Sequence, residues 1–120
     1  MSSGRIVLLL RRMRDVAADA CRITDGIGYD AFAADPMLNR AAAMSLLMAS
    51  RAATHILEAH PDFASDHGEI SWDAMRDMQG RILNDDFDVD TRRVWEMARN
   101  DAPLLVSGLD AVIDWHIQGE

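Results

Sequence analysis

The stretch Asp35–Pro61, DPMLNRAAAMSLLMASRAATHILEAHP, decides the fold. Its apolar residues recur every three to four positions, which is the period of one face of an α-helix. Asp35 can accept hydrogen bonds from backbone N–H groups of the first turn, and Pro36 suits that turn because it has no N–H to leave unpaired. Pro61 ends the pattern, so we predict a helix between the two prolines. Its predicted apolar face comprises Leu38, Ala41, Ala42, Met44, Leu47, Met48, Ala52, Ile56 and Ala59.

The same spacing extends toward the N-terminus and predicts a first helix from Arg5 to Thr24. Gly26 suits a left-handed cap at its end, and residues 29–34 are expected to form a connection. The predicted apolar face of this helix comprises Ile6, Leu9, Leu10, Met13, Val16, Ala17 and Ala20.

Toward the C-terminus, residues 62–69 are polar and typical of turns. Ser71 is then expected to cap a third helix over Trp72–Leu83. After an acidic connection at residues 85–90, Asp90 is expected to cap a fourth helix, whose apolar face continues to Trp115.

Pro103 would interrupt this fourth helix with a kink or a restart. Glycines are few, and no stretch alternates as a β-strand does. The sequence therefore predicts an all-α fold, an antiparallel bundle of four or five helices, forming one domain over residues 1–120.

Charge and composition bound the function. The formal net charge of −8 makes the domain a poor general binder of RNA or DNA, whose phosphates attract cationic surfaces. A local RNA site or a basic protein partner stays open. The longest apolar run, Ile6–Leu10, is too short to span a membrane, and no targeting segment is evident. The single cysteine, Cys21, is predicted to be buried and inert in a reducing compartment, so we expect the cytoplasm.

The sequence predicts neither a metal site nor a cofactor. His55 and His60 are five residues apart and project about 140° from one another around a helix, while His67 and His116 fall elsewhere. Residues 86–97 begin like a calcium-binding loop but lack its required Gly and Glu. No Walker loop, dinucleotide fingerprint or nucleophile elbow is present.

Methionines and tryptophans are expected mainly to pack. Eight methionines could form an adaptable binding groove, but five lie at core spacing and favour burial: Met13, Met44, Met48, Met75 and Met78. The tryptophans are predicted to be core or interface anchors: Trp72, Trp95 and Trp115.

One longer pattern resembles a known family. It comprises Phe32 and Asp35, then Glu69-Ile70-Ser71-Trp72, Met75, Met78, Phe87-Asp88-Val89-Asp90, Val94-Trp95, Asp101-Ala-Pro-Leu-Leu and Leu109. The pattern is similar to the HepT-like family, the toxin halves of HepT–MNT toxin–antitoxin pairs within the HEPN ribonuclease superfamily. The resemblance implies a HEPN-like bundle, a homodimer, metal-independent RNA cleavage at the dimer cleft and an MNT-type nucleotidyltransferase antitoxin as partner.

The family's signature is an Arg, a His five residues later and a Tyr two residues after the His. These positions fall on Gln79, Asn84 and Asp86. In the family, the Arg stabilises phosphoryl charge, the His moves protons, and the Tyr accepts AMP groups from the partner. An asparagine cannot serve as a general acid or base, a function that commonly contributes about 10²–10⁴-fold. The substitutions therefore predict an inactive or attenuated enzyme.

Arg76 and Arg81 flank Gln79 and could in principle restore a positive charge to the site. Three functions follow from the sequence. The first is a degenerate HepT-like protein that acts by binding its partner. The second is an active ribonuclease toxin with a rearranged site. The third is a structural interaction module outside any toxin system.

Overall fold

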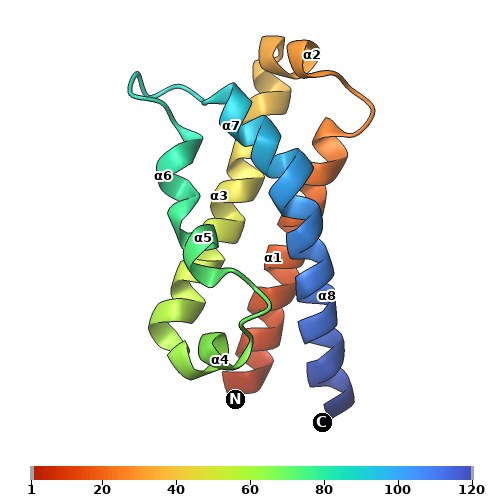
Figure 1. Cartoon of the computed structure of the whole chain (residues 1–120), viewed down its shortest axis with the longest axis vertical. Helices are drawn as coiled ribbons and strands as arrows, with labels where there is room; N and C mark the ends of the chain where they lie inside the picture. Colours follow the sequence, from red (N-terminus) through yellow and green to blue (C-terminus); the bar gives the residue numbers. More distant parts are fainter. Residues whose placement is uncertain (1, 120) are drawn as a thin grey trace.

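The computed structural model describes the backbone of residues 2–119 and the side chains of residues 4–115. Three long helices lie alongside one another, and shorter helices complete the bundle (Figure 1). The all-α prediction is confirmed. The elements are α1 (Ser2–Thr24), α2 (Tyr29–Ala34), α3 (Pro36–Ala59), α4 (Pro61–Asp66), α5 (Trp72–Asp77), α6 (Gln79–Ile82), α7 (Thr91–Glu96), the π-helical turn η1 (Met97–Asp101) and α8 (Ala102–Gly119).

Helix α3 begins and ends as its sequence predicts. The Asp35 carboxylate accepts hydrogen bonds from the N–H groups of Met37 at 3.0 Å and Leu38 at 3.4 Å, so it caps the helix. The predicted apolar face was wrong in part, because Met44 and Met48 are 56% and 49% exposed. The core side of α3 carries mostly small residues, which allow close approach of α1. Its buried residues are Asn39, Ala42, Ala43, Leu46, Ala49, Ser50, Ala53 and Ile56.

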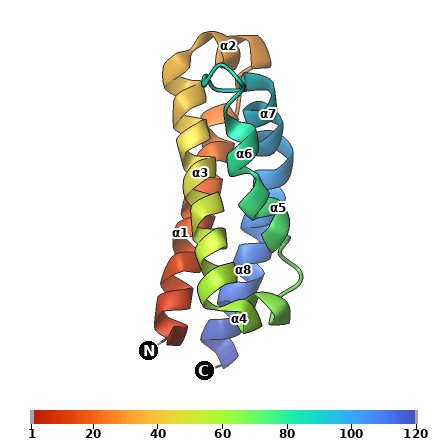
Figure 2. The same ribbon diagram turned by 90° about the vertical axis from the view of Figure 1, so that its left-hand side faces the viewer.

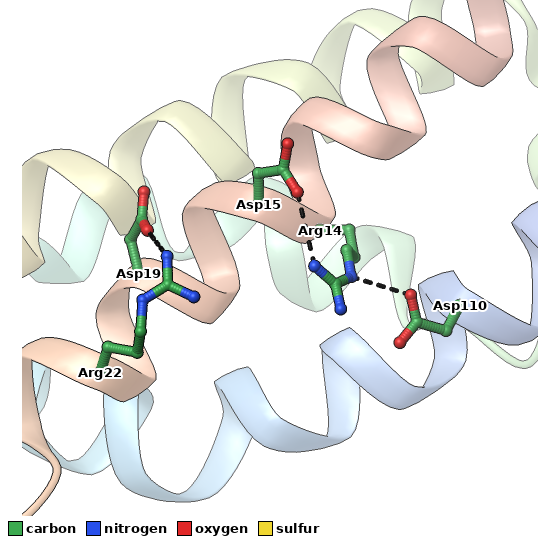
Figure 3. Close-up of polar contacts among 5 residues, drawn as sticks. All are labelled: Arg14, Asp15, Asp19, Arg22 and Asp110. Carbon is green, nitrogen blue, oxygen red and sulfur yellow. Dashed lines mark hydrogen bonds and ion pairs between the residues drawn. The ribbon is translucent and has the colours of Figure 1, made fainter.

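Helix α1 packs between α3 and α8. Leu10, Met13 and Ala17 are fully buried along it, and Gly26 adopts the predicted left-handed conformation with φ of +75°. Figure 3 shows the ion pair that joins α1 to α8, in which Arg14 Nε donates to Asp110 Oδ1 at 2.8 Å. This hydrogen bond is the main cause of the raised pKa of Arg14.

Local ion pairs lie beside this contact between helices. Arg14 also contacts its neighbour Asp15, and Arg22 pairs with Asp19 one turn away on α1 (Figure 3). Only the bond from Arg14 to α8 couples two helices, so the other two pairs act within α1.

Two segments expected as connections are helical. Residues 29–34 form α2, which is seated on α3 because the buried Asn39 amide donates to the carbonyls of Phe32 and Ala33, each at 3.3 Å. Residues 61–66 form α4, which Pro61 begins immediately after α3 ends. Both helices have only six residues, too few for a periodic stripe to reveal.

The predicted third helix is two short helices, α5 and α6, that meet at Met78. The Ser71 hydroxyl makes no capping hydrogen bond there, so this predicted cap was wrong. The cap predicted at Asp90 is confirmed, since its carboxylate accepts from the Arg93 N–H at 3.1 Å. The interruption predicted near Pro103 takes the form of the π-helical turn η1, and Pro103 lies in the first turn of α8.

The tryptophans differ in burial. Trp72 is buried, and its Nε1 donates to the His67 carbonyl at 3.0 Å. Trp95 packs against Phe32 with ring centroids 5.2 Å apart. Trp115 is 62% exposed, so it does not belong to the core of the bundle.

Within the described part of the chain, no helix combines the length and apolar character needed to cross a membrane.

Candidate functional site

The segment that carries the three signature positions lies along the outer side of α3. Figure 2 shows α5 and α6 beside that helix. The buried Ser50 of α3 donates a hydrogen bond from Oγ to the Arg76 carbonyl at 3.1 Å. This bond joins the end of α5 to α3, and α6 begins shortly after it, at Gln79.

Gln79 faces residues that the sequence did not associate with it. It lines a pocket of about 250 Å³ with four residues of α3, namely Arg51, Thr54, His55 and Glu58. A cationic group and an imidazole therefore lie beside the position of the family's arginine. The spacing of residues 51, 55 and 58 places them on one helical face, but the sequence could not show that α6 covers that face.

Asn84 builds the loop after α6. Its side-chain Oδ1 accepts from the N–H groups of Asp86 at 2.9 Å and Asp88 at 3.2 Å. Its own N–H donates to the Asp88 carbonyl at 2.8 Å. Leu83 and Val89 then pair as an antiparallel bridge that closes the loop. The Asn84 amide therefore has a structural role, and it cannot transfer a proton as the family's histidine would.

The four residues Asp85–Asp88 form an exposed turn that we call the acidic tip. Phe87 is 86% exposed and has a φ of +61°, a left-handed conformation that is unfavourable for a bulky side chain. Asp85, Asp86 and Asp88 are the neighbours of Phe87 in the chain, and all three residues are exposed. An RNA phosphate approaching the tip would meet like charges, whereas a basic protein surface would be attracted.

The two flanking arginines lie outside the Gln79 pocket. Arg76 pairs with Asp73 at 3.3 Å and with Asp77 at 3.2 Å. Arg81 instead lines a pocket of about 240 Å³ between α5–α6 and α8, together with Asp101. The structure therefore does not bring Arg76, Arg81 and Gln79 into one site.

The described residues contain no group of three His, Cys, Asp or Glu side chains able to hold a metal ion. The His55 and His60 rings do lie near one another, with centroids 6.2 Å apart. The side chain of His116 lies outside the described residues.

The segment expected to carry the signature lies between the long helices α3 and α8, in an all-α arrangement that is consistent with a HEPN-like bundle. A family model described as "Ribonuclease HepT-like" matches residues 13–112. The chain therefore belongs to the HepT-like ribonuclease family, as its sequence pattern indicates.

A similar protein comes from Caldanaerobacter subterraneus subsp. tengcongensis and is named a putative RNase, TTE0752. The two are 28% identical over 80 residues, which cover 67% of this chain and 69% of the relative. No solved structure matches the chain.

Proposed function

We propose that this chain is the HepT-like component of a HepT–MNT type toxin–antitoxin pair and that it acts by binding, with little or no RNA cleavage. The observation that carries this proposal is the structural role of the Asn84 side chain. Its amide oxygen is engaged by two backbone N–H groups at the position of the family's histidine. Gln79 is uncharged, and loss of one charge-stabilising donor commonly slows such reactions about 10²–10³-fold.

The acidic tip supports a binding role. It presents the exposed Phe87 in a turn that also carries three exposed aspartates. Aromatic side chains are frequent anchors of protein interfaces, and the surrounding charges favour a basic partner. We propose that the tip takes part in association with an MNT-type nucleotidyltransferase and that the chain itself forms a homodimer in the cytoplasm.

Restoring the signature tests the catalytic part of this proposal. The triple variant Gln79→Arg, Asn84→His, Asp86→Tyr should cleave RNA without added metal, whereas the natural chain should not. The matched control carries Ala in place of His at position 84 and should stay inactive. Circular dichroism checks that each variant folds. Cleavage by the natural chain at the rate of the triple variant would contradict the proposal.

Co-expression tests the partner. We expect the chain to be recovered with a neighbouring MNT-type nucleotidyltransferase and, after separation, to sediment as a dimer. Recovery of the chain alone as a monomer would exclude both associations.

A second candidate function is an active ribonuclease with a rearranged site. The observation that favours it is the pocket in which Arg51 and His55 lie beside Gln79. In such a site, His55 would move the proton and Arg51 would stabilise phosphoryl charge. If induction of the chain arrests bacterial growth and degrades RNA, His55→Ala should abolish both effects, while His60→Ala, a change one turn away, should not.

A further inference from the structure

A third hollow is lined by residues of α4, of the loop that follows it and of α8. This groove has a volume of about 740 Å³, within the range of pockets that hold small molecules. Its lining is distinctive, with three aromatic rings, two carboxylates and an apolar floor. These residues are Phe63, His67, Trp115, Asp66, Glu69 and Val112.

The three rings support one another and form a continuous wall. Phe63 and His67 have centroids 4.5 Å apart, and His67 meets Trp115 edge to face at 5.5 Å. The His67 ring is further oriented by Glu69, whose Oε1 lies 3.1 Å from Nδ1. The His67 carbonyl accepts the indole hydrogen bond of the buried Trp72, so the wall is anchored to the core.

Charge in this groove favours a cation. The faces of aromatic rings are negative, and tryptophan attracts cations most strongly. Trp115 lines the groove and is 62% exposed. Asp66 and Glu69 add carboxylates, and neither Arg nor Lys is among the described residues that line the groove. The net charge of −8 raises the local concentration of cations further.

The apolar floor of the groove indicates which kind of cation it would bind. A bare metal ion prefers a set of oxygen ligands, and here only two carboxylates are supplied. An alkylated ammonium ion is weakly hydrated, and its methyl groups can contact Val112 and the rings. We propose that the groove of α4 and α8 is a binding site for a quaternary ammonium group, held by cation–π contact with Trp115 and by the charge of Glu69 and Asp66.

Ligand titration of the full chain tests this site. The probes are choline and its neutral isostere 3,3-dimethyl-1-butanol, and the readout is the NMR signal of the Trp115 indole N–H, assigned with Trp115→Phe. Choline should shift this signal and bind about tenfold or more tightly than the isostere, consistent with cation–π attraction. Equal binding of the two probes, or no shift with choline, would overturn the proposal.

Variants test whether Trp115 and Glu69, rather than the overall charge of the chain, are responsible for choline binding. Trp115→Leu should abolish choline binding, and Glu69→Gln should weaken it several-fold. Asp114→Asn is the matched control, because it removes an exposed carboxylate of α8 that does not line the groove. If Asp114→Asn weakens binding as much as Glu69→Gln does, then overall charge is responsible and the site is rejected. Thermal melting verifies that each variant is folded.

A quaternary ammonium group can belong to a free small molecule or to a modified protein side chain. A short peptide with one trimethyl-lysine therefore forms a second arm of the titration. Tighter binding of the peptide than of choline identifies a protein side chain as the source of the cation, and the reverse order identifies a small molecule. Binding of neither probe contradicts the site.

Discussion

Two regions of the molecule differ in the role of their residues. One is the frame, which consists of the three long helices α1, α3 and α8, and the other is the segment Gln79–Asp90. In the frame, Leu10, Leu46 and Leu109 are completely buried, and their identity is dictated by packing. In the segment, Gln79 and the acidic tip are exposed, and the loop is held by hydrogen bonds among its own residues.

Under the proposed function, this difference means that the fold and the chemistry of this family can separate. Substitutions at exposed positions remove little buried area and leave the bundle intact. The chain can therefore keep the HepT-like frame while its signature positions hold Gln79, Asn84 and Asp86. In the loop, the Asn84 amide oxygen accepts two backbone hydrogen bonds of the turn.

The largest expected effect lies in the frame. Leu46→Ala removes a fully buried side chain of α3 and should lower the free energy of unfolding by about 2–5 kcal/mol. Urea denaturation followed by circular dichroism measures this loss. Met48→Ala is the matched control on the exposed side of the same helix and should change stability by no more than about 0.5 kcal/mol. A similar loss in both variants would mean that the core side of α3 is assigned incorrectly.

The variants at Leu46 and Met48 also bear on how much of the fold the sequence alone could predict. Periodicity located the long helices, and the caps at Asp35 and Asp90 marked the starts of α3 and of the short helix α7. It did not orient α3 correctly, because alanines and methionines occur around much of the helix. Burial there follows from the close approach of α1, which favours alanine over methionine at the contact.

The candidate site, too, could be predicted from the sequence only in part. The assignment of Gln79, Asn84 and Asp86 to the signature positions stays a prediction of the sequence pattern, and Asn84 and the acidic tip are local features of a short loop. The neighbours of Gln79 could not be found, because Arg51 and His55 reach it only through packing of α6 on α3. The groove of α4 and α8 could not be predicted from the sequence either, since Trp115 and Phe63, which line it, are far apart in the chain.

The second largest effect is expected in the loop. Asn84→Ala removes the acceptor of two backbone hydrogen bonds and should cost about 1–2 kcal/mol. Amide hydrogen exchange should accelerate at Asp86 and Asp88 and remain unchanged in α1. Asn84→Asp keeps an acceptor oxygen and should preserve most of the protection. Unchanged exchange in the alanine variant would show that the side chain does not hold the turn.

A smaller change of opposite sign is expected at the neighbouring residue. Phe87→Gly relieves the left-handed backbone and should raise the free energy of unfolding by about 1 kcal/mol. Phe87→Ala removes the same exposed ring but retains the Cβ, so it should give no such gain. Chemical denaturation compares the two. A glycine variant less stable than the alanine variant would argue against strain at this position.

The smallest effect concerns Cys21 of α1, for which the predicted burial was wrong in part, because the residue packs against the core but is only partly buried. Burial raises the pKa of its thiol, although the nearby Arg99 acts in the opposite direction. The unfolded chain therefore loses this proton at lower pH than the folded chain. The contribution of Cys21 to stability is complete below the unfolded pKa, about 8.5, and declines as pH rises through the folded value.

Cys21→Ala should remove this alkaline decline, which denaturation of both proteins across that pH range would reveal. Alkylation of the thiol offers an independent measurement. The folded chain should react more slowly than the unfolded chain, because only the thiolate is nucleophilic. Equal rates in the two states would contradict the raised pKa and would place Cys21 among the accessible groups of α1, outside the packed frame on which the comparison rests.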